Sequence, residues 1–290
     1  MTDVLRYTAF ATDPAGGNRA GVVLDAAGLT DERMAAIAAE VGYSETAFLT
    51  PGPADGAAGG EAAGAAGRSF TARYFSPAAE VPFCGHATVA TAVALAERLG
   101  PGDFVLHTRP GRVPVAVTEA EGVLKATLSS VEPHVREAAD GDVAEALAAL
   151  RWPAADLDPA LPPRIAFAGA HHLVLAAATR ARLAGLDYDF ERLRALMERL
   201  DLTTVQLVWR ESPDVFHVRD PFPVGGVVED AATGAAAAAF GAYARELGLA
   251  GDSARLTLHQ GHDMGRPSLL EVEMRADDPR VHVTGAAVRI

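Results

Sequence analysis

One carboxylate stands in a segment that otherwise has the pattern of a buried β-strand. The segment reads SETAFL, and Glu45 shares a strand face with Ala47 and Leu49 because strand side chains alternate between faces. A carboxylate on an apolar face is paired, exposed at the end of the strand, or desolvated so that it holds its proton more tightly. The last state suits a group that shuttles protons. Glu45 is therefore a candidate acid–base residue that we expect to be buried, and a glutamate at the rim of a sheet is the alternative.

A second candidate lies where the chain enters a long apolar helix, expected from about His86 to Leu99. The residues CGHAT place Gly85 and His86 at the start of this helix. The first N–H groups of a helix have no partner within it, so they can bind an anion such as a substrate carboxylate. His86 could hydrogen-bond a ligand at the same point. A loop-to-helix cap with a structural histidine is the alternative.

The same arrangement recurs before a second alanine-rich helix, expected over about Thr233–Leu247. Asp230, Thr233 and Gly234 stand at its start. An anion-binding helix terminus with a neighbouring carboxylate is again indicated. The alternative is that Asp230 only caps the helix.

Other kinds of chemistry find little support. His171 and His172 are adjacent and would point to opposite faces of a strand, and His259 and His262 have no third ligand close by in the sequence. No glycine pattern of a dinucleotide or phosphate loop is present, nor a G-x-S-x-G elbow. The single cysteine, Cys84, excludes a two-thiol mechanism within one chain. We therefore expect no metal and no cofactor.

Charge and hydropathy limit the partners. The 290 residues include 25 Lys and Arg against 38 Asp and Glu, a formal net charge of −13, which argues against a nucleic-acid partner. No run reaches the ~18 apolar residues of a membrane helix. The N-terminal residues lack the pattern of a signal peptide. We expect a cytoplasmic protein with a small-molecule substrate and no membrane or nucleic-acid partner.

Strand-like runs alternate with about five helices along the chain, so the expected fold class is α+β. The Gly/Ala/Pro-rich segment Pro51–Gly67 is expected to be a surface loop that joins two strands. A polar stretch at Ser130–Gly141 indicates a domain boundary. The expected domains are residues 1–130 and 131–290, and the C-terminal strands can cross back to the first half.

The two halves have the pattern of a diverged repeat. ARYFSP at Ala72–Pro77 is followed by Glu80 and the first apolar helix, and VRDPFP at Val218–Pro223 is followed by Glu229 and the second. Both helices are apolar on nearly every face, so protein must surround each of them. A strand shell around one central helix, formed twice, would satisfy this requirement. Chance similarity of two alanine-rich helices is the alternative.

These motifs together resemble those of the PhzF-like (phenazine biosynthesis) family. SETAF, RYFSP with CGHAT, VEDAATG and QGHDMGRPS occur in that family's order and spacing, and the N-terminal GNRAGVVLD is also similar. The resemblance implies the diaminopimelate epimerase-like fold, in which two similar α+β domains each place a barrel-like sheet around a central helix. It further implies a cofactor-independent isomerase with its site in the cleft between the domains, and a homodimer.

The resemblance also implies roles for individual residues. Glu45 matches the proton shuttle, and His86 and Asp230 match its catalytic neighbours. The repeat of the two halves further predicts that His86 and Asp230 lie on opposite walls of one pocket, each beside a helix N-terminus. The matching substrate-binding positions are Ser44, Gly85, Thr233, Gly234 and Ala235.

Three positions depart from the family pattern: Arg19 and Ala231 replace prolines, and Ala235 replaces a serine that contacts the substrate in the phenazine enzyme. We expect an isomerase of secondary metabolism that moves a proton on a small, carboxylate-bearing, unsaturated substrate. The alternatives are a ligand-binding or tailoring protein without catalysis, and a lyase or hydrolase that uses the same cleft.

Overall fold

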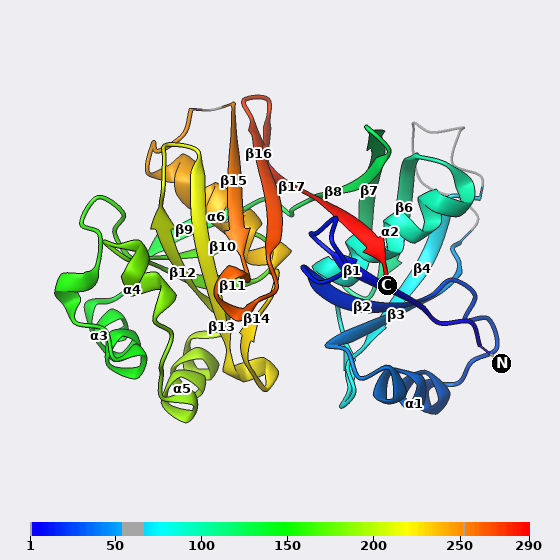
Figure 1. The fold of residues 1–290 in the computed structure, drawn as a ribbon, viewed down its shortest axis with the longest axis horizontal. Coiled ribbons are helices and arrows are strands. Elements are labelled where there is room, and N and C mark those ends of the chain that lie inside the picture. The colour runs from blue at the N-terminus through cyan, green and yellow to red at the C-terminus, as the bar shows by residue number, and fades with distance from the viewer. Residues whose placement is uncertain (1, 54–66, 252) are drawn as a thin grey trace. The chain divides into compact units, whose positions relative to one another are not determined.

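The computed structural model describes residues 2–53, 67–251 and 253–290, and the chain forms two compact units (Figure 1). Unit 1 comprises Met1–Ser129 together with Thr284–Ile290, and unit 2 comprises Ser130–Val283. Both units contain strands and helices, so the α+β class is confirmed. Most of the predicted loop at Pro51–Gly67 lies outside the described residues.

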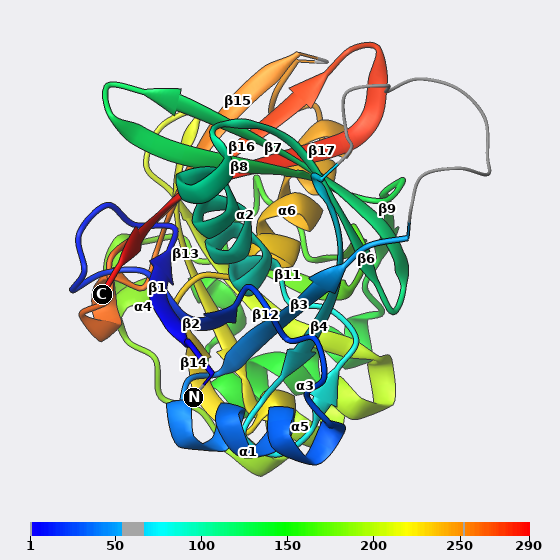
Figure 2. The same cartoon turned by 90° about the vertical axis from the view of Figure 1, so that its right-hand side faces the viewer.

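Unit 1 surrounds one helix with strands (Figure 2). Its elements are β1 (Leu5–Ala9), β2 (Asn18–Val23), α1 (Asp31–Val41), β3 (Glu45–Pro51), β4 (Ser69–Phe75), β5 (Glu80–Val81), α2 (Gly85–Leu99), β6 (Gly102–Thr108), β7 (Gly111–Ala120) and β8 (Val123–Ser129). Helix α2 packs against β1, β2, β3, β7 and β8. Every residue from His86 to Ala96 is buried, as the apolar pattern predicts. These side chains are mostly alanine, valine and threonine, which lets strands approach the helix on all sides.

Unit 2 repeats this arrangement around α6. Its elements are β9 (His134–Glu137), α3 (Asp140–Leu150), β10 (Arg164–Phe167), β11 (His171–Ala176), α4 (Arg180–Ala184), α5 (Phe190–Leu200), β12 (Leu202–Arg210), β13 (Val215–Phe222), β14 (Val227–Asp230), α6 (Gly234–Glu246), β15 (Ala254–Gln260), β16 (Ser268–Arg275) and β17 (Asp278–Arg289). Helix α6 packs against β9, β10, β11 and β16. At Gly241 a Cβ would lie 2.8 Å from Val272 and 2.7 Å from Val281, so this contact leaves no room for a side chain.

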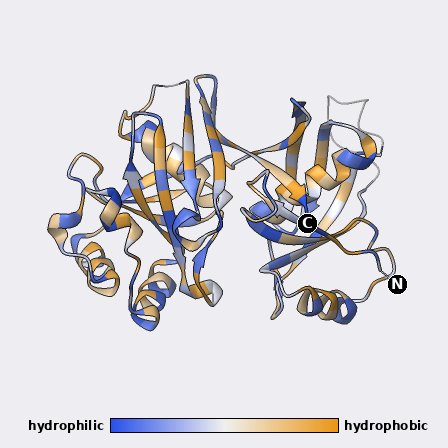
Figure 3. Ribbon diagram, viewed as in Figure 1, coloured by the Kyte–Doolittle hydropathy of each residue, from blue (hydrophilic) through white to orange (hydrophobic). Residues whose placement is uncertain are grey.

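Other helices cover the outside of each sheet, and they mix hydrophilic and hydrophobic residues (Figure 3). In unit 2, α5 buries Leu193, Leu196 and Met197, which join α3 and the outer face of β11 and β12 in one core. The described residues contain six α-helices rather than about five. The polar stretch predicted as a boundary is partly regular, because Arg164 of β10 pairs with Glu137 of β9. None of the described helices is both long enough and apolar enough to cross a membrane.

Strand β17 begins in unit 2, and its last residues complete unit 1. Tyr7 of β1 pairs with Arg289 of β17. Phe10, just after β1, is fully buried with a left-handed backbone (φ 62°), and its N–H donates to the carbonyl of Ala286 at 2.7 Å. A Cβ at Gly285 would lie 2.2 Å from Cδ1 of the Phe10 ring. The close approach of β17 to Phe10 therefore requires glycine at this position.

We expect Gly285→Ala to lower the free energy of unfolding by about 1–3 kcal/mol, because the new Cβ would clash with the ring of Phe10, which is fully buried. Gly141→Ala in α3 is the matched control, since a Cβ there meets open space. That variant should be neutral or gain up to about 1 kcal/mol. Urea unfolding followed by circular dichroism measures both. Equal stability of the two variants would contradict the close contact.

Candidate functional site

The carboxylate of Glu45 lies beside the start of α2 in unit 1. Its Oε2 atom is 3.3 Å from Nε2 of His86 and accepts a hydrogen bond from Sγ of Cys84 at 3.4 Å. Of the three states open to it, Glu45 therefore adopts the paired one. The expectation that it is buried is wrong: its side chain keeps 17% exposure because it stands at the first residue of β3. The carboxylate is held by its neighbours and remains partly exposed.

The imidazole of His86 is buried and held from two sides. Its Nδ1 atom is 3.2 Å from the amide nitrogen of Asn18, and its Nε2 atom is 3.2 Å from the hydroxyl of Ser44. The NH₂ group of Asn18 can only donate, so Nδ1 accepts and Nε2 carries the proton in this arrangement. That N–H points toward Ser44 and Glu45. His86 is thus oriented within the candidate site.

Asn18 is a site residue that local sequence reasoning did not identify. It opens β2 directly after Gly17, whose backbone is left-handed (φ 66°). A Cβ at Gly17 would lie 2.4 Å from the carbonyl oxygen of Ala9, so only glycine allows this turn. The Gly-Asn pair therefore places an amide next to His86. The only signal for it was the similarity of the GNRAGVVLD segment to the family pattern.

The hydroxyl groups of Thr88 and Tyr74 hold the start of α2 in place. Cys84 has an extended backbone just before the helix, and its carbonyl accepts from the hydroxyl of Thr88 at 2.7 Å. The same hydroxyl lies 2.6 Å from that of Tyr74 on β4, and burial raises the pKa of this tyrosine. Gly85 is the first helical residue. These contacts position the helix terminus against Glu45.

Glu45, Cys84 and His86 form a cluster of potential metal ligands. Each residue contributes one possible ligand atom, and these three atoms all lie within 4.8 Å of one another. The sequence-based expectation of no metal relied on short ligand spacing, but Glu45 and Cys84 are 39 residues apart. The fold supplies a cluster that this criterion could not detect.

In unit 2, Asp230 ends β14 next to the start of α6. Its Oδ2 atom accepts from the hydroxyl of Thr233 at 2.7 Å. Gln260 joins both residues: its amide donates to the Asp230 carbonyl at 2.9 Å and accepts from the Thr233 N–H at 3.0 Å. Gly234 and Ala235 are the first two residues of α6. The four predicted residues thus lie together at one helix terminus.

The motif Gln260–Ser268 supports this terminus. Ser268 donates to the carbonyl of Ala231 at 2.8 Å. Gly261 is left-handed (φ 73°), and a Cβ there would lie 2.2 Å from the carbonyl oxygen of Arg266. The motif therefore packs a tight turn against the segment before α6. Its function is to position that segment, which sequence reasoning had not assigned.

An arginine–glutamate pair precedes the central helix in each unit. Arg73 contacts Glu80 through Nε at 2.7 Å and Nη2 at 2.9 Å, and these bonds hold the pKa of Glu80 below its usual value. Arg219 contacts Glu229 in the same two-pronged way at 2.9 Å and 2.5 Å. Both pairs join the strand before the helix to the segment that leads into it. The matching contacts favour a true repeat over chance similarity.

Three buried polar side chains, those of His172, Thr204 and Asp220, form a hydrogen-bonded series near Asp230. His172 Nδ1 is 2.8 Å from the hydroxyl of Thr204, which donates to Oδ1 of Asp220 at 2.7 Å. Burial lowers the pKa of His172 to about 3 and raises that of Asp220 well above its usual value. Asp220 also pairs with Asp230 across β13 and β14, so their side chains share one side of the sheet. Asp220 therefore holds its proton to a higher pH than an exposed aspartate does, next to Asp230.

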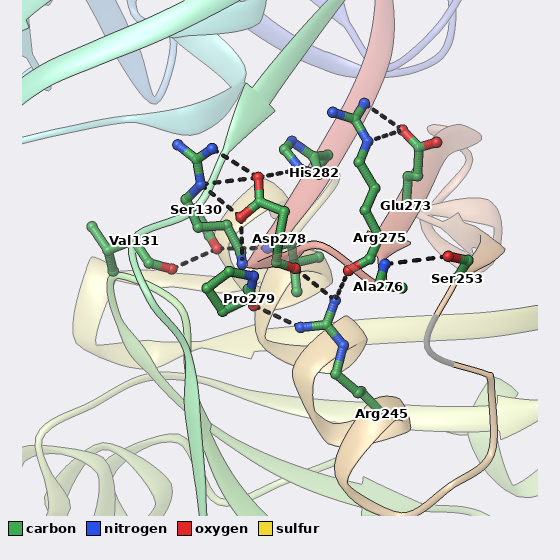
Figure 4. A network of polar contacts seen from close by, with 12 residues as sticks. Ser130, Val131, Arg245, Ser253, Glu273, Arg275, Ala276, Asp278, Pro279 and His282 are labelled. Carbon is green, nitrogen blue, oxygen red and sulfur yellow. Dashed lines mark hydrogen bonds and ion pairs between the residues drawn. The ribbon is translucent and has the colours of Figure 1, made fainter.

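Two further features lie apart from these clusters. The pair His259 and His262 is joined by His217 of β13, whose ring centroid is 5.0 Å from that of His259. A surface hollow of about 440 Å³ in unit 2 contains no predicted site residue. Its charges are neutralised locally, for example where Arg275 in its wall pairs with Glu273 at 2.8 Å (Figure 4). We therefore do not place the chemistry there.

Comparison with known proteins identifies relatives over the whole chain. The family model PhzC-PhzF, described as phenazine biosynthesis-like protein, matches residues 7–290. The chain is 34% identical over 288 residues to an uncharacterized isomerase of Deinococcus radiodurans, covering 97% of this chain and 89% of that protein. It is 30% identical over 278 residues to the trans-2,3-dihydro-3-hydroxyanthranilate isomerase of Pseudomonas aeruginosa, covering 94% and 90%.

Solved structures agree with these matches. A PhzF-family phenazine biosynthesis protein of Bacillus anthracis superimposes with a TM-score of 0.85 at 26% identity, covering 100% of this chain and 97% of that one. A probable proline racemase of Agrobacterium radiobacter superimposes with a TM-score of 0.63 at 13% identity, covering 100% and 91%. The second match shows a shared fold with racemases and nothing further.

The raised pKa of Asp220, caused by its burial, predicts a pH dependence of stability. Its folded-state pKa is raised, so its contribution to stability is full below the unfolded value near 3.8 and is lost as the pH rises through the folded pKa. Asp220→Asn keeps an oxygen that accepts from Thr204 and removes the titration. The variant should therefore gain stability relative to the parent as the pH rises from about 4 toward 8, measured by urea unfolding.

The matched control for this series is Asp277→Asn, since Asp277 is exposed. Its stability should parallel that of the parent across the same pH range. Parallel curves for Asp220→Asn as well would show that Asp220 is charged in the folded protein.

Proposed function

Because the chain belongs to the PhzC-PhzF family and is an isomerase of that family, we propose that it moves a proton between carbon atoms of a small, unsaturated carboxylate. Glu45 is the proposed proton-transfer group. The observation that carries this proposal is the position of its carboxylate, paired with His86 and Cys84 at the start of α2. The Glu45 carboxylate is the only one in that cluster, and it keeps access to a ligand.

In the proposed reaction, Glu45 removes a proton from one carbon of the substrate and returns it to another. A single carboxylate suffices, because the group is regenerated when the proton is delivered. Negative charge develops on the substrate between the two transfers. The N–H groups at the start of α2 and the Nε2 proton of His86 are donors suited to stabilise that charge.

The second cluster is proposed to bind polar groups of the substrate. Asp230 and Thr233 are already joined to each other and to Gln260, so their orientation does not depend on a ligand. Gly234 leaves the backbone N–H groups at the start of α6 open to close approach. A rigid terminus of this kind positions a substrate at low entropic cost.

Ala235 limits the choice of substrate. The serine of the family pattern could donate a hydrogen bond that alanine cannot, and a buried polar group without its partner costs about 1–3 kcal/mol. We therefore propose that the substrate of this protein carries an apolar group, or none, at that point. The proposed substrate differs in this respect from trans-2,3-dihydro-3-hydroxyanthranilate, the compound in the name of the relative from Pseudomonas aeruginosa.

The first test uses Glu45→Gln, which keeps the size of the side chain and removes its acid–base function. We expect proton transfer to slow by about 10²–10⁴-fold, the usual contribution of such a group. The measurement is deuterium incorporation from heavy water into a panel of cyclic unsaturated carboxylates, followed by mass spectrometry. Glu119→Gln on the exposed end of β7 is the control and should exchange at the parent rate. Full exchange by Glu45→Gln would remove Glu45 from the mechanism.

The second test compares the parent with Ala235→Ser on trans-2,3-dihydro-3-hydroxyanthranilate. We expect weak turnover by the parent and a gain of about ten- to a hundredfold with serine, since the hydroxyl restores one hydrogen bond. Absorbance or mass spectrometry of the product measures the rate. Efficient turnover by the parent that serine does not change would show that position 235 does not select the substrate.

A further inference from the structure

We propose that Asp220 is a positioning residue for Asp230: it keeps one proton within the pair, so that a single negative charge meets the substrate at the start of α6. Asp220 is fully buried and acts through Asp230. The interaction of the two aspartates is inferred from strand register, hydrogen bonds and burial within unit 2. Its consequence for substrate binding additionally rests on the proposed function of Asp230.

The two carboxyl groups lie on one side of the sheet, on neighbouring strands. Asp220 of β13 and Asp230 of β14 are direct partners in the antiparallel register. Such partners have Cβ atoms about 4.5–5.5 Å apart. Asp220 is fully buried, whereas Asp230 is only half-buried and accepts a hydrogen bond from the Thr233 hydroxyl at 2.7 Å. Asp230 is therefore the member of the pair that a ligand at the start of α6 can reach.

Hydrogen bonds fix one oxygen of Asp220 as an acceptor. The single proton of the Thr204 hydroxyl goes to Oδ1 of Asp220 at 2.7 Å, so Nδ1 of His172 donates to Thr204 at 2.8 Å. Both donors thus point toward Oδ1. The other oxygen, Oδ2, is buried and has no hydrogen-bond partner within the described part of the chain. A proton on Oδ2 removes the charge that would otherwise be buried there without compensation.

The charged groups around Asp220 also favour its protonated form. The two with the largest effect are Asp230 and Glu229 of β14, both negative, and Glu229 is already paired with Arg219. His172 of β11 is neutral in the ordinary pH range, because burial lowers its pKa to about 3. The remaining polar side chains beside the pair, from β12, β15 and the start of α6, carry no charge: Thr204, Gln206, Gln260 and Thr233.

The two carboxyl groups therefore ionise in a fixed order. Neighbouring carboxylates oppose each other's ionisation. Asp230 ionises first, since it is half-exposed and the Thr233 hydroxyl donates to its Oδ2 atom. Burial, with the charge of Asp230 added to it, raises the pKa of Asp220, which keeps its proton to a higher pH. Between the two ionisations the pair carries one negative charge, located on Asp230.

Ionisation of Asp220 would displace Asp230 from its position. Strand β13 is held between β12 and β15, whereas β14 is a strand of four residues that ends at Asp230. Repulsion between two charged carboxylates therefore moves the end of β14 more easily than it moves β13. Substrate binding should weaken at high pH as a result. Proton transfer by Glu45 of unit 1 should not change in the same way, so the effect belongs to KM and not to kcat.

Nuclear magnetic resonance of the full chain, with aspartate labelled by carbon-13 at the carboxyl carbon, tests the interaction without any substrate. Asp220→Asn and Asp230→Asn assign the two signals. We expect the Asp230 signal to shift in two steps, the second at the pH at which Asp220 titrates, and Asp220→Asn to abolish that second step. An Asp230 signal with one step, or an Asp220 that titrates near the ordinary value of 3.8, would overturn the proposal.

Thr204→Val is a second variant that keeps both aspartates. It removes the hydroxyl that stabilises the charged form of Asp220, so Asp220 should titrate at a higher pH than in the parent. The second step of the Asp230 signal should move with it, and a step that stays at the parent pH would contradict the pairing. Asp277→Asn at an exposed position is the matched control and should leave both steps unchanged.

The deuterium-exchange assay tests the consequence for substrate binding. With a carboxylate that exchanges, KM of the parent should rise by about tenfold for each pH unit above the pKa of Asp220, because the fraction of protein competent to bind falls by that factor. Asp220→Asn should not show this rise, and kcat should follow the same pH profile in both proteins. Equal KM profiles would overturn the role in binding. If the two-step titration is observed but no carboxylate exchanges deuterium, the proposed proton transfer has failed and the interaction of the two aspartates stands.

Discussion

The rest of the structure depends on two helices that are apolar on nearly every face. Residues His86–Ala96 of α2 are buried without interruption, and α6 is nearly the same. Such a helix is stable only if protein encloses it, so the strands of each unit must pack around their helix. Only the ends of the helix can then reach a ligand. Its unpaired N–H groups make the N-terminal end the place where polar chemistry gathers.

The side chains around each terminus fall into two groups with different tasks. Glu45, His86 and Asp230 present polar atoms at the helix starts, whereas Gln260 and the Arg73–Glu80 pair hold the approaching backbone. Ion pairs of this kind add little to stability when they are partly exposed. Their value here is geometric, since a two-pronged contact fixes direction as well as distance.

Local sequence patterns predicted the elements that carry the site and missed what joins them. The apolar run before Leu99 and the SETAFL segment each indicate one element by their own periodicity, and the structure confirms α2 and β3. Asn18 could not be found in this way, because it meets His86 across 68 residues. Asp220 was missed for the same reason: its environment is created by strand pairing. The proton-transfer function of Glu45 stays a prediction.

The return of β17 to unit 1 has a consequence for biosynthesis. Residues 284–290 belong to unit 1, and their strand pairs with β1, which the ribosome produces before β17. Unit 2 is continuous in the sequence and can fold while the chain is still being translated. Most of unit 1 is synthesised before unit 2, but its strand β1 keeps an unpaired edge until residues 284–290 have been made. An unpaired strand edge invites wrong pairing. A nascent chain that ends before residue 284 therefore exposes the β1 edge that β17 covers in the folded protein.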